Sequence, residues 1–283
     1  MKRIKKDQFV HHFQNKMIGL FLGDTDFSEI VLKKIKELKI KYFIIDFSTN
    51  NKFKRDNKSF KISIGKFGKI LSLIKEKKAK KVLFAGKITK PRFSTLRLDL
   101  KGIYYMPSVI RAAKTGDAAI IKSIINILDN EKIKVISSIF YNPELTQKAG
   151  IYTKLKPNKI DLKSINKGIK YFNKLNNLDH VQALIVKDGK IISTETNKGT
   201  KKMMSSLKKK TNGILIKFPK KKQDLRMDLP TIGLHTLQDC KKYGLKGIVL
   251  KSKKNIFLDR DKSINFANKN RIFIRIIWRK FLF

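Results

Sequence analysis

Cysteine is nearly absent from this sequence, and long apolar runs are missing. The only cysteine in 283 residues is Cys240. A single thiol excludes an internal disulfide and a zinc site built from several cysteines, which fits a reducing compartment. No apolar run approaches the roughly 20 residues that a membrane-spanning helix needs. The basic start of the chain is not followed by a continuous apolar segment, so we expect no secretory signal and a cytoplasmic protein.

Acidic residues are also scarce, which leaves the chain strongly basic. Lys and Arg number 66 against 22 Asp and Glu, so the net charge is +44. Such a charge is typical of nucleic-acid binding. However, the lysines are scattered along the whole chain and outnumber the arginines that bind phosphates and guanines bidentately. We therefore favour compositional drift and expect no nucleic-acid partner, although the charge would hold the protein near anionic lipid.

Strands and helices alternate in the first half of the chain. The pattern predicts strands at Met17–Leu22, Tyr42–Phe47, Lys81–Ala85 and Ile133–Ser137, and helices at Glu29–Leu38, Phe67–Lys77 and Pro107–Leu128. Such alternation is typical of a parallel sheet with helices on both faces. We predict an α/β protein whose N-terminal, Rossmann-like domain covers residues 1–140.

The second half is predicted to be a separate mixed α/β (α+β) domain over residues 163–283. Residues 141–162 contain the breakers Gly150 and Pro157 and are interpreted as a linker or hinge. The pair Asp188-Gly189 between two apolar runs predicts a β-hairpin. Further helices are predicted at Ser164–Leu175, Lys201–Lys209 and His235–Tyr243, and further strands at Gly213–Phe218, Gly247–Leu250 and Ile272–Ile277.

Two loops of the predicted N-terminal sheet carry residues suited to phosphate. Gly23 ends the first strand before a helix, where backbone N–H groups can approach a phosphate, although an ordinary turn explains it equally well. The second loop follows the third strand and combines a glycine, cations and hydroxyls, among them Gly86, Lys87, Thr89 and Ser94. This loop is suited to a diphosphate, and a solvated basic loop is the alternative.

Further candidates are Asp117, within the predicted long helix, and the segment Glu195–Thr200. Asp117 suits a site, but helix capping explains it at least equally well. Glu195 ends a predicted strand and would ligate a cation, while the amide of Gly199 and the hydroxyl of Thr200 hold phosphate oxygens. A helix cap explains Thr200 equally well.

The sharpest feature is the cluster of Asp224, Arg226 and Asp228. In an extended segment these side chains, two residues apart, would share one face. Diphosphate hydrolysis needs carboxylates that hold a hard cation or orient water, and a fixed positive charge for the oxygens of the transition state. The alternative is a surface salt bridge worth at most about 1 kcal/mol.

These segments, in this order, resemble the UDP-2,3-diacylglucosamine pyrophosphatases of the lipid A pathway, of the LpxI type. The similar stretches are Ile64–Lys69, Phe84–Ser94, Lys114–Asp117, Glu195–Thr200 and Arg226–Gly233. The run Asp-Leu-Pro-Thr-Ile-Gly, which begins at Asp228, is the most specific of them. The resemblance spans nearly the whole chain, from residue 17 to residue 275.

The resemblance implies hydrolysis of the nucleotide–lipid to UMP and 2,3-diacylglucosamine 1-phosphate, with Mg²⁺ (or Mn²⁺) as cofactor. It also implies an N-terminal domain that binds the nucleotide sugar, a catalytic C-terminal domain, and a ligand between them. The family's essential aspartate falls on Asp228, which would hold the cation or activate water, with Glu195, Asp224 and Asp117 as further metal ligands. The expected substrate-binding residues are Gly23, Gly86, Lys87, Thr89, Ser94, Gly199, Thr200, Arg226 and Thr231.

Three positions depart from the family's pattern. Asp24 follows the first glycine where further glycines are usual, Ala118 stands in place of a second aspartate, and Lys201 stands in place of an acid. A catalytically weakened nucleotide–lipid binding protein is therefore one alternative, and a basic nucleic-acid-binding module is another.

The expected partners are the nucleotide–lipid substrate and the cytoplasmic face of the inner membrane, to which the protein would bind peripherally. The C-terminal run Phe273–Phe283 is suited to membrane docking, and a buried last strand is the favoured alternative. The sequence leaves open whether the protein forms a homodimer.

Overall fold

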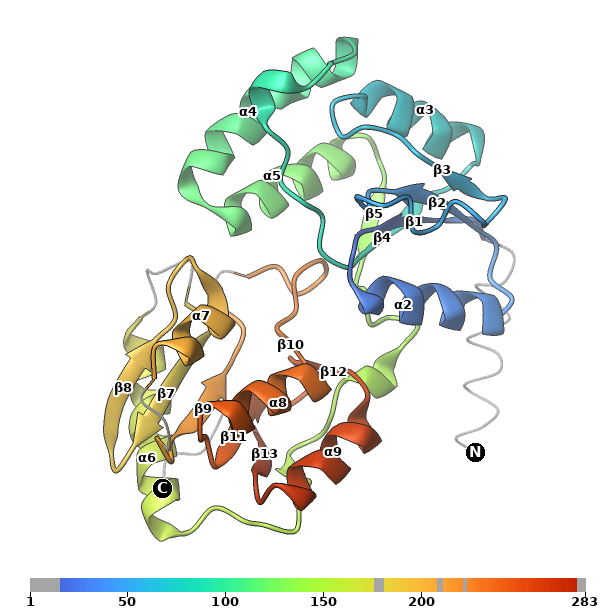
Figure 1. Ribbon diagram of the computed structural model, residues 1–283. Helices are drawn as coiled ribbons and strands as arrows, with labels where there is room; N and C mark the ends of the chain where they lie inside the picture. Colours follow the sequence, from blue (N-terminus) through green and yellow to red (C-terminus); the bar gives the residue numbers. More distant parts are fainter. Residues whose placement is uncertain (1–15, 176–180, 208–210, 221–222, 279–283) are drawn as a thin grey trace. The chain divides into compact units, whose positions relative to one another are not determined.

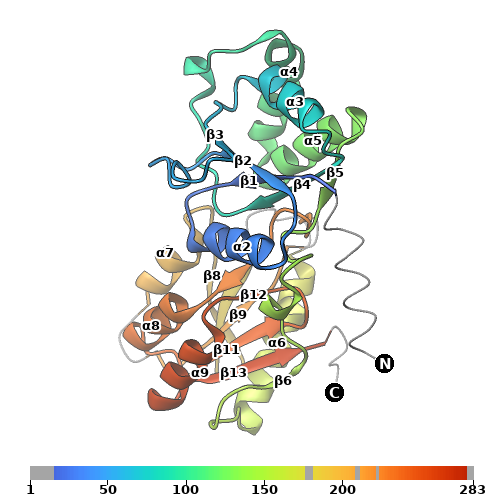
Figure 2. The same ribbon diagram turned by 90° about the vertical axis from the view of Figure 1, so that its right-hand side faces the viewer.

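The computed structural model describes residues 16–175, 181–207, 211–220 and 223–278. The chain divides into two compact units between Pro143 and Glu144, and each unit has its own main sheet (Figures 1 and 2). Within the described ranges, no helix has the length and apolar character that a bilayer crossing requires.

The first unit is built on a parallel sheet with the strand order β3-β2-β1-β4-β5. Its strands are β1 (Ile18–Leu22), β2 (Tyr42–Asp46), β3 (Ser59–Phe60), β4 (Lys81–Ala85) and β5 (Lys134–Ile136). Every residue of β1 and β2 is buried, because helix α2 covers one face of the sheet and α3 and α5 cover the other (Figure 1). The predicted parallel α/β fold of this half is confirmed.

The helices of this unit are α2 (Asp26–Glu37), α3 (Phe67–Glu76), α4 (Leu100–Thr115) and α5 (Asp117–Asn130), with a short 3₁₀ helix, η1 (Phe93–Thr95). The prediction of one helix over Pro107–Leu128 is wrong. Gly116 has a φ of 142°, which only glycine adopts readily, and this residue ends α4 and precedes α5.

The second unit has a mixed sheet in the order β6-β13-β11-β9-β7-β8, as the predicted fold class requires. Its strands are β6 (Gly150–Ile151), β7 (Ala183–Lys187), β8 (Lys190–Thr194), β9 (Ile214–Lys217), β11 (Gly247–Lys251) and β13 (Phe273–Ile277). The predicted β7–β8 hairpin is confirmed. Asp188 and Gly189 both have positive φ values, of 46° and 72°, as a tight hairpin turn requires.

Alternate residues of this sheet form two separate cores. Leu184, Val186 and Ile216 pack with Ile165 of α6 (Lys159–Lys174) on one face. The opposite face packs against α7 (Gly199–Ser205), α8 (Leu234–Lys242) and α9 (Arg260–Lys269). A small parallel pair, β10 (Thr231–Ile232) and β12 (Ile256–Phe257), completes the unit.

The expected linker and C-terminal docking segments contain regular structure. Residues 141–162 include a 3₁₀ helix, η2 (Pro143–Leu145), the strand β6, which pairs with β13, and the start of α6. A hinge role for this segment stays a prediction. At the C-terminus, β13 is largely buried, in accord with the favoured alternative of a last strand. Trp278 is half exposed, and residues 279–283 of the expected docking run lie outside the described residues.

Candidate functional site

The two glycine loops of the first unit lie side by side at the point where the strand order reverses. The connections that leave β1 and β4 run to opposite sides of the sheet, and ligands of open α/β sheets bind at such a point. Gly23 follows β1 and Gly86 follows β4. The N–H of Gly23 donates to the carbonyl of Ala85 at 2.9 Å, so the two loops are directly bonded.

Both glycines are required by this close approach. A Cβ atom on Gly23 would lie 2.2 Å from the carbonyl oxygen of Lys87, and one on Gly86 would lie 2.0 Å from Oγ of Ser28. The N–H of Asp24 also donates to the Lys87 carbonyl, at 2.9 Å. The N–H groups of Gly23 and Asp24 thus bind the neighbouring loop, and a role of Gly23 in phosphate binding stays a prediction.

Asp24, the first departure from the family's pattern, ties three loops together. Its Oδ1 accepts hydrogen bonds from the N–H of Thr49 at 2.7 Å and from the Thr49 hydroxyl at 2.9 Å. Its Oδ2 accepts from the Thr89 hydroxyl at 3.3 Å. These bonds, the Thr49 N–H above all, lower the pKa of the Asp24 carboxyl. A fixed negative charge therefore stands at this edge, next to the predicted ligand Thr89.

The remaining predicted residues of this unit lie along the loop after Gly86. Ser94 is exposed on η1. Asp117 is the first residue of α5, and its Oδ1 lies 3.9 Å from Nζ of Lys90. Because Asp117 is exposed, this ion pair contributes little to stability.

In the second unit, Glu195 is a buried carboxylate, 3% exposed, just beyond β8. Its Oε1 accepts a hydrogen bond from the Thr200 hydroxyl at 2.6 Å, and its Oε2 accepts from the N–H of Gln182 at 2.8 Å. Gly199, with a φ of 84°, begins α7 between these two residues. The structure therefore brings Glu195 and Thr200 into contact, and the roles of Glu195, Gly199 and Thr200 toward a cation or phosphate stay predictions.

Lys217, the last residue of β9, is a functional candidate that sequence reasoning missed. Its Nζ donates to the carbonyl of Thr231 at 3.2 Å. Burial lowers the pKa of the Lys217 ammonium, and the negative charges of Glu195 and, more weakly, Asp228 act in the opposite direction. The available signal in the sequence was a lysine directly after the apolar run Ile214–Ile216. This signal did not single out Lys217, because lysines are abundant along the whole chain.

The segment around Asp224 is a turn, so the extended form in which the three charged side chains would share one face is not adopted. The N–H groups of Met227 and Asp228 donate to the Asp224 carbonyl at 3.2 and 3.0 Å. The Asp224 carboxylate accepts from the N–H of Arg226 at 2.9 Å and from its guanidinium at 2.8 Å. An aspartate that bonds to the backbone two residues on stabilises a turn, and this local bonding prevails over the extended form.

The residues after Asp228 fix its position. Leu229 and Ile232 are buried, and the carbonyl of Pro230 accepts a hydrogen bond from the N–H of Ile256 at 3.0 Å. Asn255 holds the neighbouring strand ends, since its Nδ2 donates to the Lys217 carbonyl at 3.0 Å. Asp228 thus lies, partly buried, in a segment anchored near the carboxyl ends of β9 and β11.

Two buried amide groups adjoin these residues without a hydrogen-bond partner in the described part of the chain. They are Oε1 of Gln182, next to Glu195, and Nε2 of Gln223, next to Asp224. A buried polar atom without a partner costs about 1–3 kcal/mol. These two atoms favour polar partners close to Glu195 and close to Asp224.

The predicted metal ligands do not converge in the regions described. No group of three or more His, Cys, Asp or Glu side chains suited to a metal ion is found among these residues. Asp117 belongs to the other unit, Asp224 is paired with Arg226, and Glu195 already accepts two hydrogen bonds. A cation held by one or two carboxylates together with substrate phosphates is compatible with this arrangement, and its ligands stay predictions.

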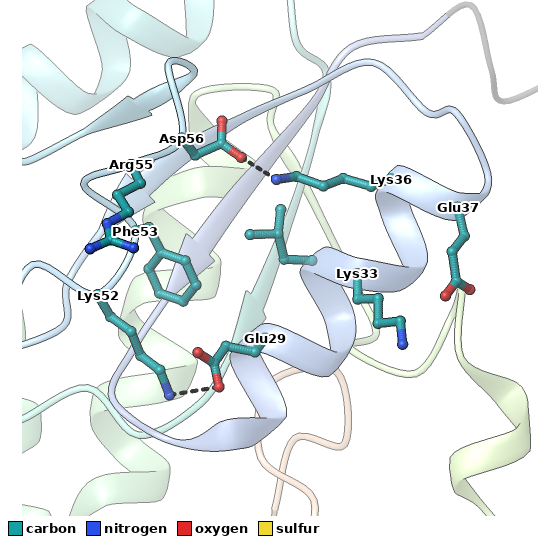
Figure 3. Close-up of a pocket in the computed structure, with 9 residues that line it drawn as sticks. Glu29, Lys33, Lys36, Glu37, Lys52, Phe53, Arg55 and Asp56 are labelled. Carbon is teal, nitrogen blue, oxygen red and sulfur yellow. Dashed lines mark ion pairs between the residues drawn. The ribbon is translucent and has the colours of Figure 1, made fainter.

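A surface pocket of about 460 Å³ lies elsewhere, beside α2 in the first unit (Figure 3). Two of its four cations are paired, with Lys36 2.7 Å from Asp56 and Lys52 3.0 Å from Glu29. None of the predicted site residues lines it. Because no predicted site residue lies in it, we do not place the phosphate site there.

Two family models cover almost the whole chain. The LpxI N-terminal domain matches residues 17–145, and the LpxI C-terminal domain matches residues 148–275. The chain belongs to the LpxI family. A relative from Caulobacter vibrioides, named UDP-2,3-diacylglucosamine pyrophosphatase LpxI, is 29% identical over an alignment of 223 residues, with coverage of 75% of this chain and 80% of the relative. The resemblance noted in the sequence is thereby confirmed, and the site residues above are those of an LpxI-family chain.

Proposed function

We propose that this chain hydrolyses the diphosphate bond of UDP-2,3-diacylglucosamine to UMP and 2,3-diacylglucosamine 1-phosphate. Membership of the LpxI family and the name of the Caulobacter relative support the reaction. The structural observation that carries it is Lys217, whose ammonium donates to the Thr231 carbonyl at 3.2 Å, at the sheet edge where β8 ends next to Glu195 and near which the segment of Asp228 is anchored. Opposite charges at one sheet edge suit a reaction in which water attacks a phosphate.

In the proposed reaction, each charged side chain has a separate role. Water adds its oxygen to one phosphorus, and the bond from that phosphorus to the bridging oxygen breaks. We assign Asp228 to orient the attacking water or hold the cation. Lys217 and Arg226 would stabilise the negative charge on the phosphate oxygens, because fixed positive charges in a partly buried site stabilise such a transition state strongly.

We also propose that the reaction requires Mg²⁺ or Mn²⁺, with Asp228 as the principal protein ligand. Such a cation would neutralise charge on the diphosphate. In the first unit, the paired loops at Gly23 and Gly86 would take the nucleotide, with Lys87, Thr89 and Ser94 near the phosphates. Their place at the reversal of strand order supports this assignment.

The test is release of UMP from UDP-2,3-diacylglucosamine by purified protein, with and without Mg²⁺. Asp228→Asn should lower the rate at least about a hundredfold, because it removes the charge and keeps the shape. Asp261→Asn is the matched control in the same unit. Asp261 is exposed and pairs with its neighbour Arg260, so this variant should keep full activity.

An Asp228→Asn protein as active as the control would remove the assignment of Asp228. Tight substrate binding by the unchanged protein, without UMP release under any divalent cation, would favour the weakened binding protein instead. The observation behind that second candidate is Asp24, whose carboxylate stands where further glycines are usual in the family.

The site of action is proposed to be the cytoplasmic face of the inner membrane, with the protein bound peripherally. A substrate with two acyl chains partitions into a bilayer, and a net charge of +44 attracts the protein to anionic lipid.

A further inference from the structure

Helix α4 presents an apolar surface to solvent in the first unit. Leu100, Ile103 and Tyr104 are 86%, 59% and 74% exposed. They are three and four residues apart, so their side chains lie on one helix face and form what we name the α4 apolar surface. Large apolar side chains gathered on one exposed face indicate an interaction site, whereas single ones do not.

The opposite face of α4 is fixed by packing and hydrogen bonds. Gly102 and Met106 are buried. Glu131 at the end of α5 accepts hydrogen bonds from Lys101 at 2.8 Å and from the Tyr105 hydroxyl at 2.7 Å. Rotation of α4 that buried its apolar surface would break these bonds. The exposure of the surface is therefore a property of the folded unit.

Positive charge flanks the α4 apolar surface at both ends. Arg97 precedes it, and Arg111 and Lys114 follow it, and all three are exposed. Arg111 and Lys114 lie on the same helix face as the surface, seven residues from Tyr104 and fourteen from Leu100. The helix contains no Asp or Glu, and it is about 24 Å long at 1.5 Å per residue.

We propose that this face of α4 docks the protein on an anionic lipid bilayer. The apolar surface would enter the boundary between headgroups and acyl chains, and its flanking cations would bind anionic headgroups. A bilayer supplies negative charge and an apolar layer along the whole helix, which is the complement of this face. The inference rests on the proposed peripheral membrane binding and deepens it by naming the surface responsible, and its test needs no turnover.

The experiment measures binding of the full-length protein to vesicles by sedimentation. The vesicles contain equal parts of phosphatidylcholine and phosphatidylglycerol, or phosphatidylcholine alone, at a salt concentration that screens generic charge. The unchanged protein should bind the anionic vesicles. Leu100→Ser combined with Tyr104→Ser should weaken this binding about tenfold or more, since both side chains then no longer enter the bilayer.

The matched control is Ile160→Ser combined with Tyr171→Ser on α6 in the second unit. These side chains are also an aliphatic and a tyrosine, 59% and 36% exposed. The control should bind vesicles as the unchanged protein does. Far-ultraviolet circular dichroism would confirm that both variants are folded.

A second measurement keeps the apolar surface intact. Trp278 is the only tryptophan, so Tyr104→Trp with Trp278→Phe places a single reporter on α4. Its fluorescence should shift to the blue on anionic vesicles and be quenched by brominated acyl chains.

Equal vesicle binding by the Leu100/Tyr104 variant and the α6 control would overturn the proposal, as would a reporter whose emission does not shift. Self-association that depends on Leu100 and Tyr104, without vesicle binding, would show a second copy as the partner and also overturn it. Because no substrate is present, failure of the hydrolysis assay would leave these results standing.

Discussion

Lys217 carries a positive charge at the partly buried end of a strand, where a charge loses hydration and needs partners. Its direct partner is the Thr231 carbonyl, and Glu195 and Asp228 contribute negative charge around it. Apolar neighbours occupy the same strand, so packing alone would favour another apolar residue at this position. A charge kept here at such a cost is best explained by the chemistry of the site.

We expect Lys217→Met to lower the rate of UMP release about a hundredfold while the protein stays folded, because the variant removes a positive charge from the phosphate site. The matched control is Lys187→Met. Lys187 also ends a strand, but β7 runs antiparallel to β9, so it lies at the opposite edge of the sheet. Equal loss of rate in both variants would contradict a role for Lys217 at the site.

Glu131 is the residue whose charge should govern stability in acid. Hydrogen bonds from Lys101 and Tyr105 lower its pKa from 4.5 to about 2, with a further contribution from Lys75. Because the folded-state pKa lies below the unfolded value, the carboxylate stabilises the fold fully above about pH 4.5, and this contribution is lost as the pH falls towards 2.

Glu131→Gln should therefore lower the free energy of unfolding at pH 7 by about 1–3 kcal/mol. The difference between variant and unchanged protein should shrink as the pH falls from 4.5 to about 2. Urea unfolding at several pH values is the measurement. Glu76→Gln, whose exposed carboxylate pairs with Lys77, is the control and should change stability by at most about 0.5 kcal/mol. A pH-independent effect of Glu131→Gln would contradict the assignment.

At the scale of elements, one carboxylate joins two helices of the first unit. Asp99 accepts a hydrogen bond from the N–H of Gly102 at the start of α4, at 2.8 Å. It also accepts from Gly68 and Lys69 at the start of α3, both at 3.0 Å. Burial raises the pKa of Asp99, but these three N–H groups outweigh it and lower the pKa. Part of the family-like stretch Ile64–Lys69 thus serves helix capping.

Asp99→Ala should lower the free energy of unfolding by about 2 kcal/mol or more, because both helices lose their N-terminal hydrogen bonds. Asp99→Asn keeps a side-chain oxygen and should retain most of the stability. Urea unfolding of both variants is the measurement. If Asp99→Asn lowered the free energy of unfolding as much as Asp99→Ala, the hydrogen bonds to the side-chain oxygen would not be what stabilises the two helices.

For the whole molecule, each unit contains a complete sheet with helices on both faces. The first main sheet uses only strands up to β5, and the second uses only strands from β6 onward. The two cores of the second sheet draw only on residues after the boundary at Glu144. Each unit therefore has the sheet and covering helices of a domain of its own.

Fragments 1–143 and 144–283 should each fold when expressed alone. For each fragment we expect a single cooperative unfolding transition in urea, monitored by circular dichroism, because each has its own sheet and covering helices. A fragment that unfolds gradually, and gains a sharp transition only when the other is added, would show that the units depend on each other for stability.

The sequence by itself determined the longer strands and the class of fold. Buried parallel strands such as Tyr42–Asp46 read as continuous apolar runs because both faces are covered, and Asp188-Gly189 fixes the hairpin because these residues accept positive φ. The family also followed from the sequence, since several short motifs occur in the right order. These features depend on a residue and its near neighbours.

Only the tertiary structure decided the position of Lys217, the turn at Asp224 and the pairing of short strands. The strands β6, β10 and β12 have two residues each and exist because distant segments supply hydrogen-bond partners. Lys217 became a site residue because β9 ends beside Thr231, fourteen residues further along the chain. Such features were not predictable because their energy comes from contacts between residues far apart in the chain, which a local pattern does not encode.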